Sequence, residues 1–206
     1  APAGASMLKR SVATRRALSI ATRYADRRTQ FQHPGTDDET PLLDYLAHQR
    51  KLLPAIARAY ALGFAQNELF DTYARVTSDP SHAPRAQRSL ETLAAGLKAF
   101  NTEFANASIQ VCREACGGAG YMSENRLTQL RADTDVFATF EGDNTVLLQL
   151  VAKGVLTNYR EVWGGLDRLG MVQASARMVG SSVIERTGAG LLAERLVATA
   201  RRKGDA

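Results

Sequence analysis

The sequence predicts an all-α protein, organised as an antiparallel helical bundle. Apolar residues recur at spacings of three and four over long segments, and proline and glycine separate these segments. No stretch alternates apolar and polar residues for long enough to build a sheet, and no internal repeat is present. With 206 residues, 45% of them hydrophobic, the chain suffices for one sizeable core, or for one domain and part of a second.

The first two helices are separated by a proline-rich connection. Residues 11–31 form the first predicted helix, which ends at the His-Pro-Gly sequence of residues 33–35. Residues 40–41, Thr-Pro, offer a cap and a first-turn proline for the second helix. Within that helix, Pro54 predicts a kink or a local break near Arg50, because its ring displaces the carbonyl four residues earlier.

The longest and most regular apolar pattern covers residues 85–116 and predicts a central, largely buried helix. A loop over residues 77–84 precedes it, and the glycine pair Gly117-Gly118 ends it, as glycine at a helix C-terminus does. A short helical turn is predicted over residues 126–132.

The last helix of the bundle is predicted to follow Asp143 or Asn144, either of which can cap it. We place the bundle domain at residues 1–160, because the composition changes after that point. Residues 161–206 predict the beginning of a second, incomplete helical domain. Two helices are expected in it, over residues 171–186 and 191–202.

The composition argues against several classes of function. The formal charge of +5 would suit a polyanion, but the arginines are scattered at helical spacing and no nucleic-acid-binding motif is present. No apolar run approaches the roughly 18 to 20 residues of a membrane span. The three histidines share no ligand spacing, and Cys112 and Cys116 favour a pair of buried small residues over a metal site. We therefore expect no metal, no nucleic acid, no membrane span and, without a signal-peptide pattern, an intracellular protein.

Three features have both a structural and a functional interpretation. In residues 139–146, TFEGDNTV, Glu141 is either a capping acid or a base held beside a cavity, and the residues alone favour neither. The glycines of residues 112–121 either stop a helix or let backbone amides approach a phosphate. Arg28 is either a solvated arginine or an anion clamp.

Five stretches, in a fixed order and at fixed separations, carry a family resemblance. They are RYADRRTQF (23–31), ETPLLDYLAHQ (39–49), LAAGLKAF (93–100), CREACGGAGYMSENRL (112–127) and TFEGDNTVLLQLVAKGVL (139–156). Together they resemble the C-terminal helical half of acyl-CoA oxidases, within the acyl-CoA dehydrogenase superfamily. The EGDNTVLLQ form is more similar to the oxidase branch than to dehydrogenases, which carry a shorter Glu-Gly-Thr pattern.

This resemblance implies a role for Glu141. It would be the catalytic base that removes the pro-R α-proton of a fatty acyl-CoA while a hydride leaves the β-carbon for FAD, which gives a trans-2-enoyl-CoA. Glu141 and Gly142 would contact the substrate, whose thioester carbonyl must be polarised by hydrogen bonds, including one from the glutamate's backbone amide. The residues implied to contact FAD are Arg28, Phe31, Glu114, Gly117, Gly118, Asn144 and Thr145.

The resemblance also implies an assembly. The flavin site would be shared between protomers of a homodimer or a dimer of dimers, and the flavin-binding N-terminal part would lie outside this sequence. The alternative is a helical dimerisation or partner-binding module that is inactive when separated from the flavin domain. Ala119 departs from the family, since related oxidases commonly have histidine there. The expected location is cytoplasmic, or peroxisomal in a eukaryote; neither acyl chain length nor the electron acceptor, oxygen or an electron-transferring flavoprotein, is implied.

Overall fold

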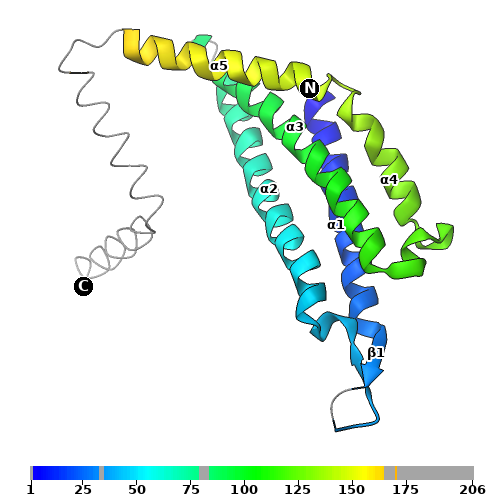
Figure 1. Ribbon diagram of the computed structural model, residues 1–206. Helices are drawn as coiled ribbons and strands as arrows, with labels where there is room; N and C mark the ends of the chain where they lie inside the picture. Colours follow the sequence, from blue (N-terminus) through cyan, green and yellow to red (C-terminus); the bar gives the residue numbers. More distant parts are fainter. Residues whose placement is uncertain (1, 33–34, 79–83, 165–169, 171–206) are drawn as a thin grey trace. The chain divides into compact units, whose positions relative to one another are not determined.

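The computed structural model describes residues 2–32, 35–78, 84–164 and 170 (Figure 1). The chain divides into two units between Val155 and Leu156. The helices predicted over residues 171–186 and 191–202 lie outside the described residues. The division into domains 1–160 and 161–206 therefore stays a prediction.

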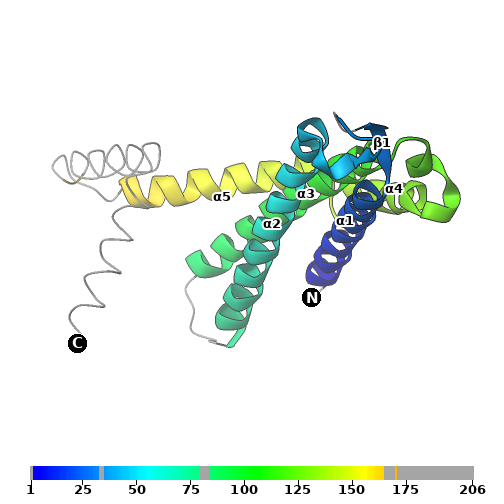
Figure 2. The same cartoon turned by 90° about the horizontal axis from the view of Figure 1, so that it is seen from below.

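The first unit is an antiparallel helical bundle, as the sequence predicts. Its helices run alternately in opposite directions, and α3 packs against α1, α2 and α4, with α2 and α4 on opposite sides (Figures 1 and 2). The α-helices are α1 (Pro2–Arg27), α2 (Leu46–Ser78), α3 (Pro84–Ala115), α4 (Leu127–Asp135) and α5 (Asn144–Gly164), of which α5 crosses the division between the units. Short 3-10 helices are η1 (Leu42–Asp44), η2 (Gly117–Tyr121), η3 (Ser123–Asn125) and η4 (Val136–Ala138).

The first predicted helix runs four residues too far at its C-terminal end, and the expectation that no sheet forms is wrong. Helix α1 ends at Arg27, and β1 (Thr29–Gln32) pairs antiparallel with β2 (Glu39–Pro41). Phe31 has a φ of 64°, a left-handed conformation that a right-handed helix excludes. The strands are too short for a recognisable alternation, and only their pairing supplies the partners for the backbone.

Helix α2 also differs from its prediction. It begins at Leu46 and not beside residues 40–41, because these residues belong to β2 and the connection to η1. The helix continues through Pro54, so the predicted local break is absent. Leu52 and Ala59 are buried on either side of the proline, and their packing against the core holds the helix together despite the missing backbone donor.

Helix α3 confirms the prediction of a central, largely buried helix to within one residue at each end. Gly117 follows it with a φ of +56°, the left-handed conformation that ends helices. The turn predicted at residues 126–132 becomes α4, which extends to Asp135.

Small side chains line the main core, which lets the helices approach one another closely. Its buried members are Ala17, Leu18, Ala21 and Ala25 of α1, Leu52 and Ala59 of α2, Ile109, Cys112, Ala115 and Cys116 at or just after the end of α3, and Leu127 of α4. A smaller cluster joins α2 to the first part of α3 through Leu69, Val76 and Leu90.

Candidate functional site

The loop between η4 and α5 holds Glu141 in an unusual backbone conformation. Glu141 has a φ of 59° and Gly142 a φ of +106°, so two consecutive residues are left-handed. Glycine adopts this conformation freely, but a glutamate does so at a cost that the surrounding structure must offset. The side chain of Glu141 is exposed. Strained backbone of this kind is concentrated at functional sites, which makes the loop a candidate site.

Asp143, and not Glu141, caps α5. The Oδ1 atom of Asp143 accepts a hydrogen bond from the backbone N–H of Thr145 at 2.8 Å. This hydrogen bond is the main reason why the pKa of the Asp143 carboxyl lies below its usual value. The capping role, one of the two interpretations considered for Glu141, is thus filled by Asp143.

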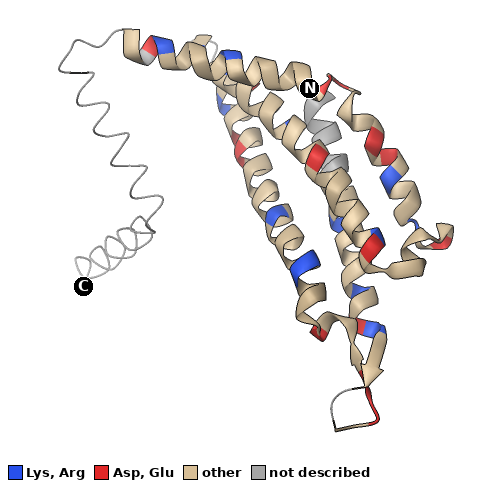
Figure 3. Cartoon of the chain, viewed as in Figure 1, with Lys and Arg blue, Asp and Glu red and all other residues tan. Residues whose placement is uncertain are grey.

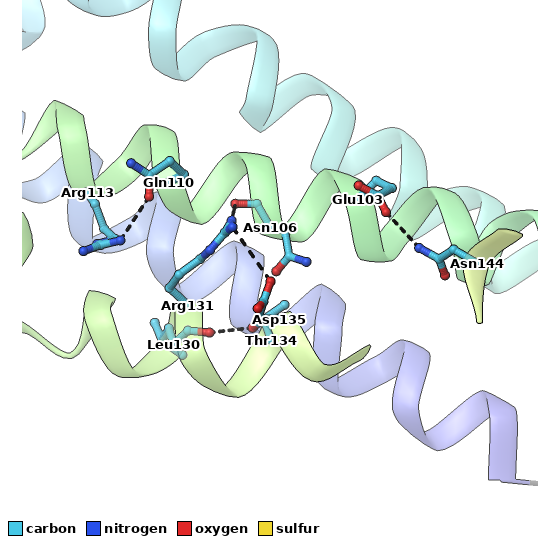
Figure 4. Close-up of polar contacts among 9 residues, drawn as sticks. All are labelled: Glu103, Asn106, Gln110, Arg113, Leu130, Arg131, Thr134, Asp135 and Asn144. Atoms are coloured by element: carbon cyan, nitrogen blue, oxygen red, sulfur yellow. Dashed lines mark hydrogen bonds and ion pairs between the residues drawn. The ribbon is translucent and has the colours of Figure 1, made fainter. Parts of the chain in front are cut away.

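A buried lysine of α3 fastens this loop to the bundle. Lys98 is 4% exposed, and its Nζ donates to the carbonyl oxygen of Gly142 at 2.5 Å and to Oδ1 of Asn144 at 2.8 Å. Asn144 in turn donates from Nδ2 to Oε1 of Glu103 at 2.9 Å (Figure 4). The side-chain amide of Asn144, predicted to contact FAD, is therefore engaged at both ends by α3, whereas the Thr145 side chain is exposed.

Sequence reasoning missed Lys98 and Glu103 as parts of the site. Lys98 lies in LAAGLKAF, between Leu97 and Ala99, at a position where the apolar pattern places the buried face of the helix. A lysine on such a face requires a buried partner. That mismatch is the signal that could have identified it.

The other residues predicted to contact FAD gather at two neighbouring chain segments. Arg28 and Phe31 lie at the end of α1 and in β1, and both are exposed, Phe31 by 67%. Glu114, Gly117 and Gly118 are exposed at the end of α3. A Cβ atom on either glycine would meet no atom within 4 Å, so the backbone there is open to close approach by a ligand.

The Glu141 loop and the Arg28 group, which here includes Glu114, Gly117 and Gly118, lie at opposite ends of α3. The β-hairpin and the C-terminal end of α3 share one end of the bundle, and α5 starts at the other (Figure 1). Lys98 and Glu114 are sixteen residues apart on one helix, which corresponds to about 24 Å. The structure thus brings Glu141, Gly142, Asn144 and Thr145 together, but it does not bring them close to the Arg28 group within one chain.

Charge and metal ligands add no competing site in the described part of the chain. Lys and Arg are interspersed with Asp and Glu along the helices (Figure 3). No group of three or more His, Cys, Asp or Glu in the described residues is placed to hold a metal ion. None of the described helices has the length and apolar character that a bilayer crossing needs.

Comparison with known proteins identifies this kind of domain, a helical bundle whose last helix follows a glutamate-glycine loop. Residues 5–156 match the family described as the acyl-CoA oxidase C-alpha1 domain. The chain therefore belongs to the acyl-CoA oxidase family, within the acyl-CoA dehydrogenase superfamily, and corresponds to the C-terminal helical part.

Individual relatives agree with this assignment. The chain is 44% identical over 147 residues to peroxisomal acyl-coenzyme A oxidase 2 of Arabidopsis thaliana, covering 71% of the chain and 21% of the relative. It is 37% identical over 158 residues to peroxisomal acyl-coenzyme A oxidase 1 of Bos taurus, covering 76% and 24%.

Two solved structures share the fold. An acyl-CoA oxidase from tomato, Lycopersicon esculentum, is similar with a TM-score of 0.77 and 32% identity, over 86% of this chain and 27% of that one. Acyl-CoA oxidase-1 of Caenorhabditis elegans, complexed with FAD and ATP, gives 0.74 and 31%, over 81% and 26%. The chain thus spans about a fifth to a quarter of the length of these relatives.

Proposed function

We propose that this chain supplies the catalytic base of a FAD-dependent acyl-CoA oxidase, with Glu141 as that base. The observation that carries the proposal is the left-handed backbone at Glu141 and Gly142, in a loop fastened to a buried lysine. Fixing a base in one geometry lowers the barrier of a proton transfer, since less motion must be frozen in the transition state. The reaction would form a trans-2-enoyl-CoA in fatty-acid β-oxidation or related acyl-CoA metabolism.

The chemistry assigned to this chain is a proton abstraction. The Glu141 carboxylate takes the α-proton of the acyl-CoA, and the electrons of that C–H bond become the α,β double bond. The backbone amide of Glu141 would hydrogen-bond to the thioester carbonyl, on which negative charge develops as the proton leaves. Bound FAD would supply the acceptor for the hydride that leaves the β-carbon.

The exposed groups at the other end of the bundle fit a FAD-binding role. Arg28 offers a guanidinium, Phe31 an aromatic face, and Gly117 and Gly118 an open stretch of backbone. These groups lie at the other end of α3 from the Glu141 loop, and Lys98 and Glu114 mark a separation of about 24 Å along that helix. We therefore propose that they contact the flavin of a neighbouring copy. A homodimer or a dimer of dimers would then share each site, and the flavin-binding N-terminal part would complete it.

The test is Glu141→Gln in an assembly that contains the flavin-binding part. The variant should abolish bleaching of the flavin by acyl-CoA and leave FAD bound, because glutamine keeps the shape but cannot take the proton. Glu124→Gln, at an exposed glutamate outside the proposed site, is the matched control and should bleach normally. Unimpaired reduction in Glu141→Gln would refute the proposal.

A second measurement concerns the electron acceptor and the location. Release of hydrogen peroxide by the complete enzyme distinguishes oxygen from an electron-transferring flavoprotein as the acceptor, and we propose oxygen. The location proposed is cytoplasmic, or peroxisomal in a eukaryote, since several relatives carry peroxisomal in their names.

A non-catalytic module for dimerisation or partner binding is the second candidate function for the chain by itself. It is favoured by large apolar side chains that α2, α3 and α5 leave exposed, a feature of interaction surfaces. They include Leu53, Tyr60, Phe64 and Tyr73 of α2, Phe100 of α3, and Val146, Leu148 and Leu150 of α5. The chain purified alone should then be colourless and inert with acyl-CoA, and a yellow, active preparation would contradict this.

A further inference from the structure

We propose that Lys98 is a positioning residue for the reaction: its ammonium group holds the Glu141 loop in the left-handed conformation that the base requires. This inference rests on the proposed function of Glu141. It adds Lys98 of α3 to the residues that would determine the rate of proton abstraction by Glu141.

The first support is the geometry of the hydrogen bonds. Lys98 donates to the carbonyl oxygen of Gly142, the residue directly after Glu141, and to the side chain of Asn144, the first residue of α5. The two acceptors lie on either side of Asp143, which caps the helix. A single ammonium group therefore fixes both the loop and the helix start that follows it.

The second support is the balance of charge and hydrogen bonds around the lysine. A buried ammonium group is costly unless hydrogen bonds and an opposite charge compensate it. The amide of Asn144 accepts one hydrogen bond from Lys98 through its oxygen. Its nitrogen donates to Glu103 (Figure 4), so the neutral amide links the ammonium group to a carboxylate. The series of hydrogen bonds from Lys98 through Asn144 to Glu103 thus forms only while the loop keeps its present position.

The third support is the close packing of α3 against the first part of α5. A Cβ atom on Gly96 would lie 3.5 Å from Val151, and one on Gly154 would lie 2.1 Å from the Thr92 hydroxyl. The first distance is an ordinary van der Waals contact that a side chain could make, whereas the second is too short for any side chain. Gly154 therefore lets the two helices approach closely at one further point beyond Lys98. The helix that carries the lysine therefore also contacts, at Thr92 and Gly154, the helix whose start the lysine holds.

The experiment compares three variants. Lys98→Met removes the charge and the donors but keeps an unbranched side chain one atom shorter, and Lys98→Arg keeps the charge. Lys153→Met makes the same change at an exposed lysine of α5 and serves as the control. Amide hydrogen exchange of residues 139–147 is measured on the full chain, and flavin reduction is measured in the assembly with the flavin-binding part.

We expect Lys98→Met to speed exchange in residues 139–147 by about tenfold or more while exchange in α1 and α4 stays unchanged, since only the loop is released. At saturating acyl-CoA, flavin reduction should slow by about 10- to 100-fold, with FAD retained and acyl-CoA affinity within about twofold, as for other residues that orient a reactive group. Lys98→Arg should recover part of the rate, and Lys153→Met should behave as the unchanged protein.

Three results would overturn the inference: a normal reduction rate in Lys98→Met, unchanged exchange in residues 139–147, or a loss explained wholly by weaker acyl-CoA or FAD binding. If Lys98→Met does not fold, Lys98→Arg and Glu103→Ala give the same test, because each alters the hydrogen-bond chain from one end. Normal flavin reduction in Glu141→Gln would instead refute the proposed function, and the exchange measurement would still report whether Lys98 holds the loop.

Discussion

The glycines of the loop after α3 allow a sharp test of the packing, because they differ in a single respect at a time. A Cβ atom on Gly120 would lie 2.0 Å from the carbonyl oxygen of Arg113, although such contacts are essentially never shorter than 3.0 Å. Gly117 has open space around it but a φ of +56°, and Gly118 has open space and no positive φ. Alanine at Gly120 therefore tests a steric clash, and alanine at Gly117 tests backbone strain. Alanine at Gly118 introduces neither and is the control.

The size of each effect follows from these distances. Gly120→Ala must displace backbone by about 1 Å, which no side-chain rotation can relieve, so we expect a loss of about 3 kcal/mol in the free energy of unfolding. Gly117→Ala should cost about 1 kcal/mol for the left-handed conformation. Gly118→Ala should stay within about 0.5 kcal/mol of the unchanged chain.

Urea unfolding followed by far-ultraviolet circular dichroism measures all three values under one set of conditions. The order of stability should be Gly118→Ala, then Gly117→Ala, then Gly120→Ala. Equal stability of Gly120→Ala and Gly118→Ala would show that the loop does not pack against α3 as described. Because Gly118→Ala leaves stability unchanged, a weaker affinity for FAD in the complete assembly would then report directly on the proposed cofactor contact.

Further outcomes follow from burial and from shifted pKa values. Leu52→Ala should lower the free energy of unfolding by about 3 kcal/mol, whereas Leu53→Ala, next to it and 53% exposed, should cost far less. Folding lowers the pKa of the Asp143 carboxyl from its usual 3.8. The ionised carboxylate therefore stabilises the fold above pH 3.8, and this stabilisation is lost as the pH falls through the lower pKa of the folded state. Asp143→Asn should remove this part of the acid dependence of unfolding, measured by a pH titration. Burial raises the pKa of Cys112 to about 12 and that of Cys116 to about 11, so at pH 8 an alkylating reagent should label both thiols only after unfolding.

The exposed apolar side chains of α2 are a candidate contact surface for the assembly. Tyr60 and Phe64 of α2 are 68% and 69% exposed. Exposing large apolar side chains to water is unfavourable, and such surfaces are typical of interaction sites. The same exposure is expected of a domain that belongs to a larger enzyme, and the chain spans only about a fifth to a quarter of its relatives. Oligomeric state in solution, measured with and without the flavin-binding part, would show whether the chain associates with further copies of itself or only with that part.

The sequence by itself determined the helical class, the central position of α3 and the family. Apolar spacing is a local property that survives without tertiary information, so α3 could be predicted almost to the residue. The five ordered stretches likewise pointed to the acyl-CoA oxidase family, which the family match over residues 5–156 confirms. The sequence did not determine which acid of TFEGDNTV caps α5, because Glu141 and Asp143 both lie near the start of that helix.

The tertiary structure decided what depends on contacts between distant residues. Residues 29–31 belong to the predicted first helix, yet pairing with residues 39–41 makes them part of strand β1. The capping of α5 by Asp143 required the actual backbone geometry of the loop. Lys98 is separated by 44 residues from the carbonyl that it binds. Spacing along one helix cannot reveal a partner that a different segment brings into place, and this is why the hold on the Glu141 loop became visible only in the folded chain.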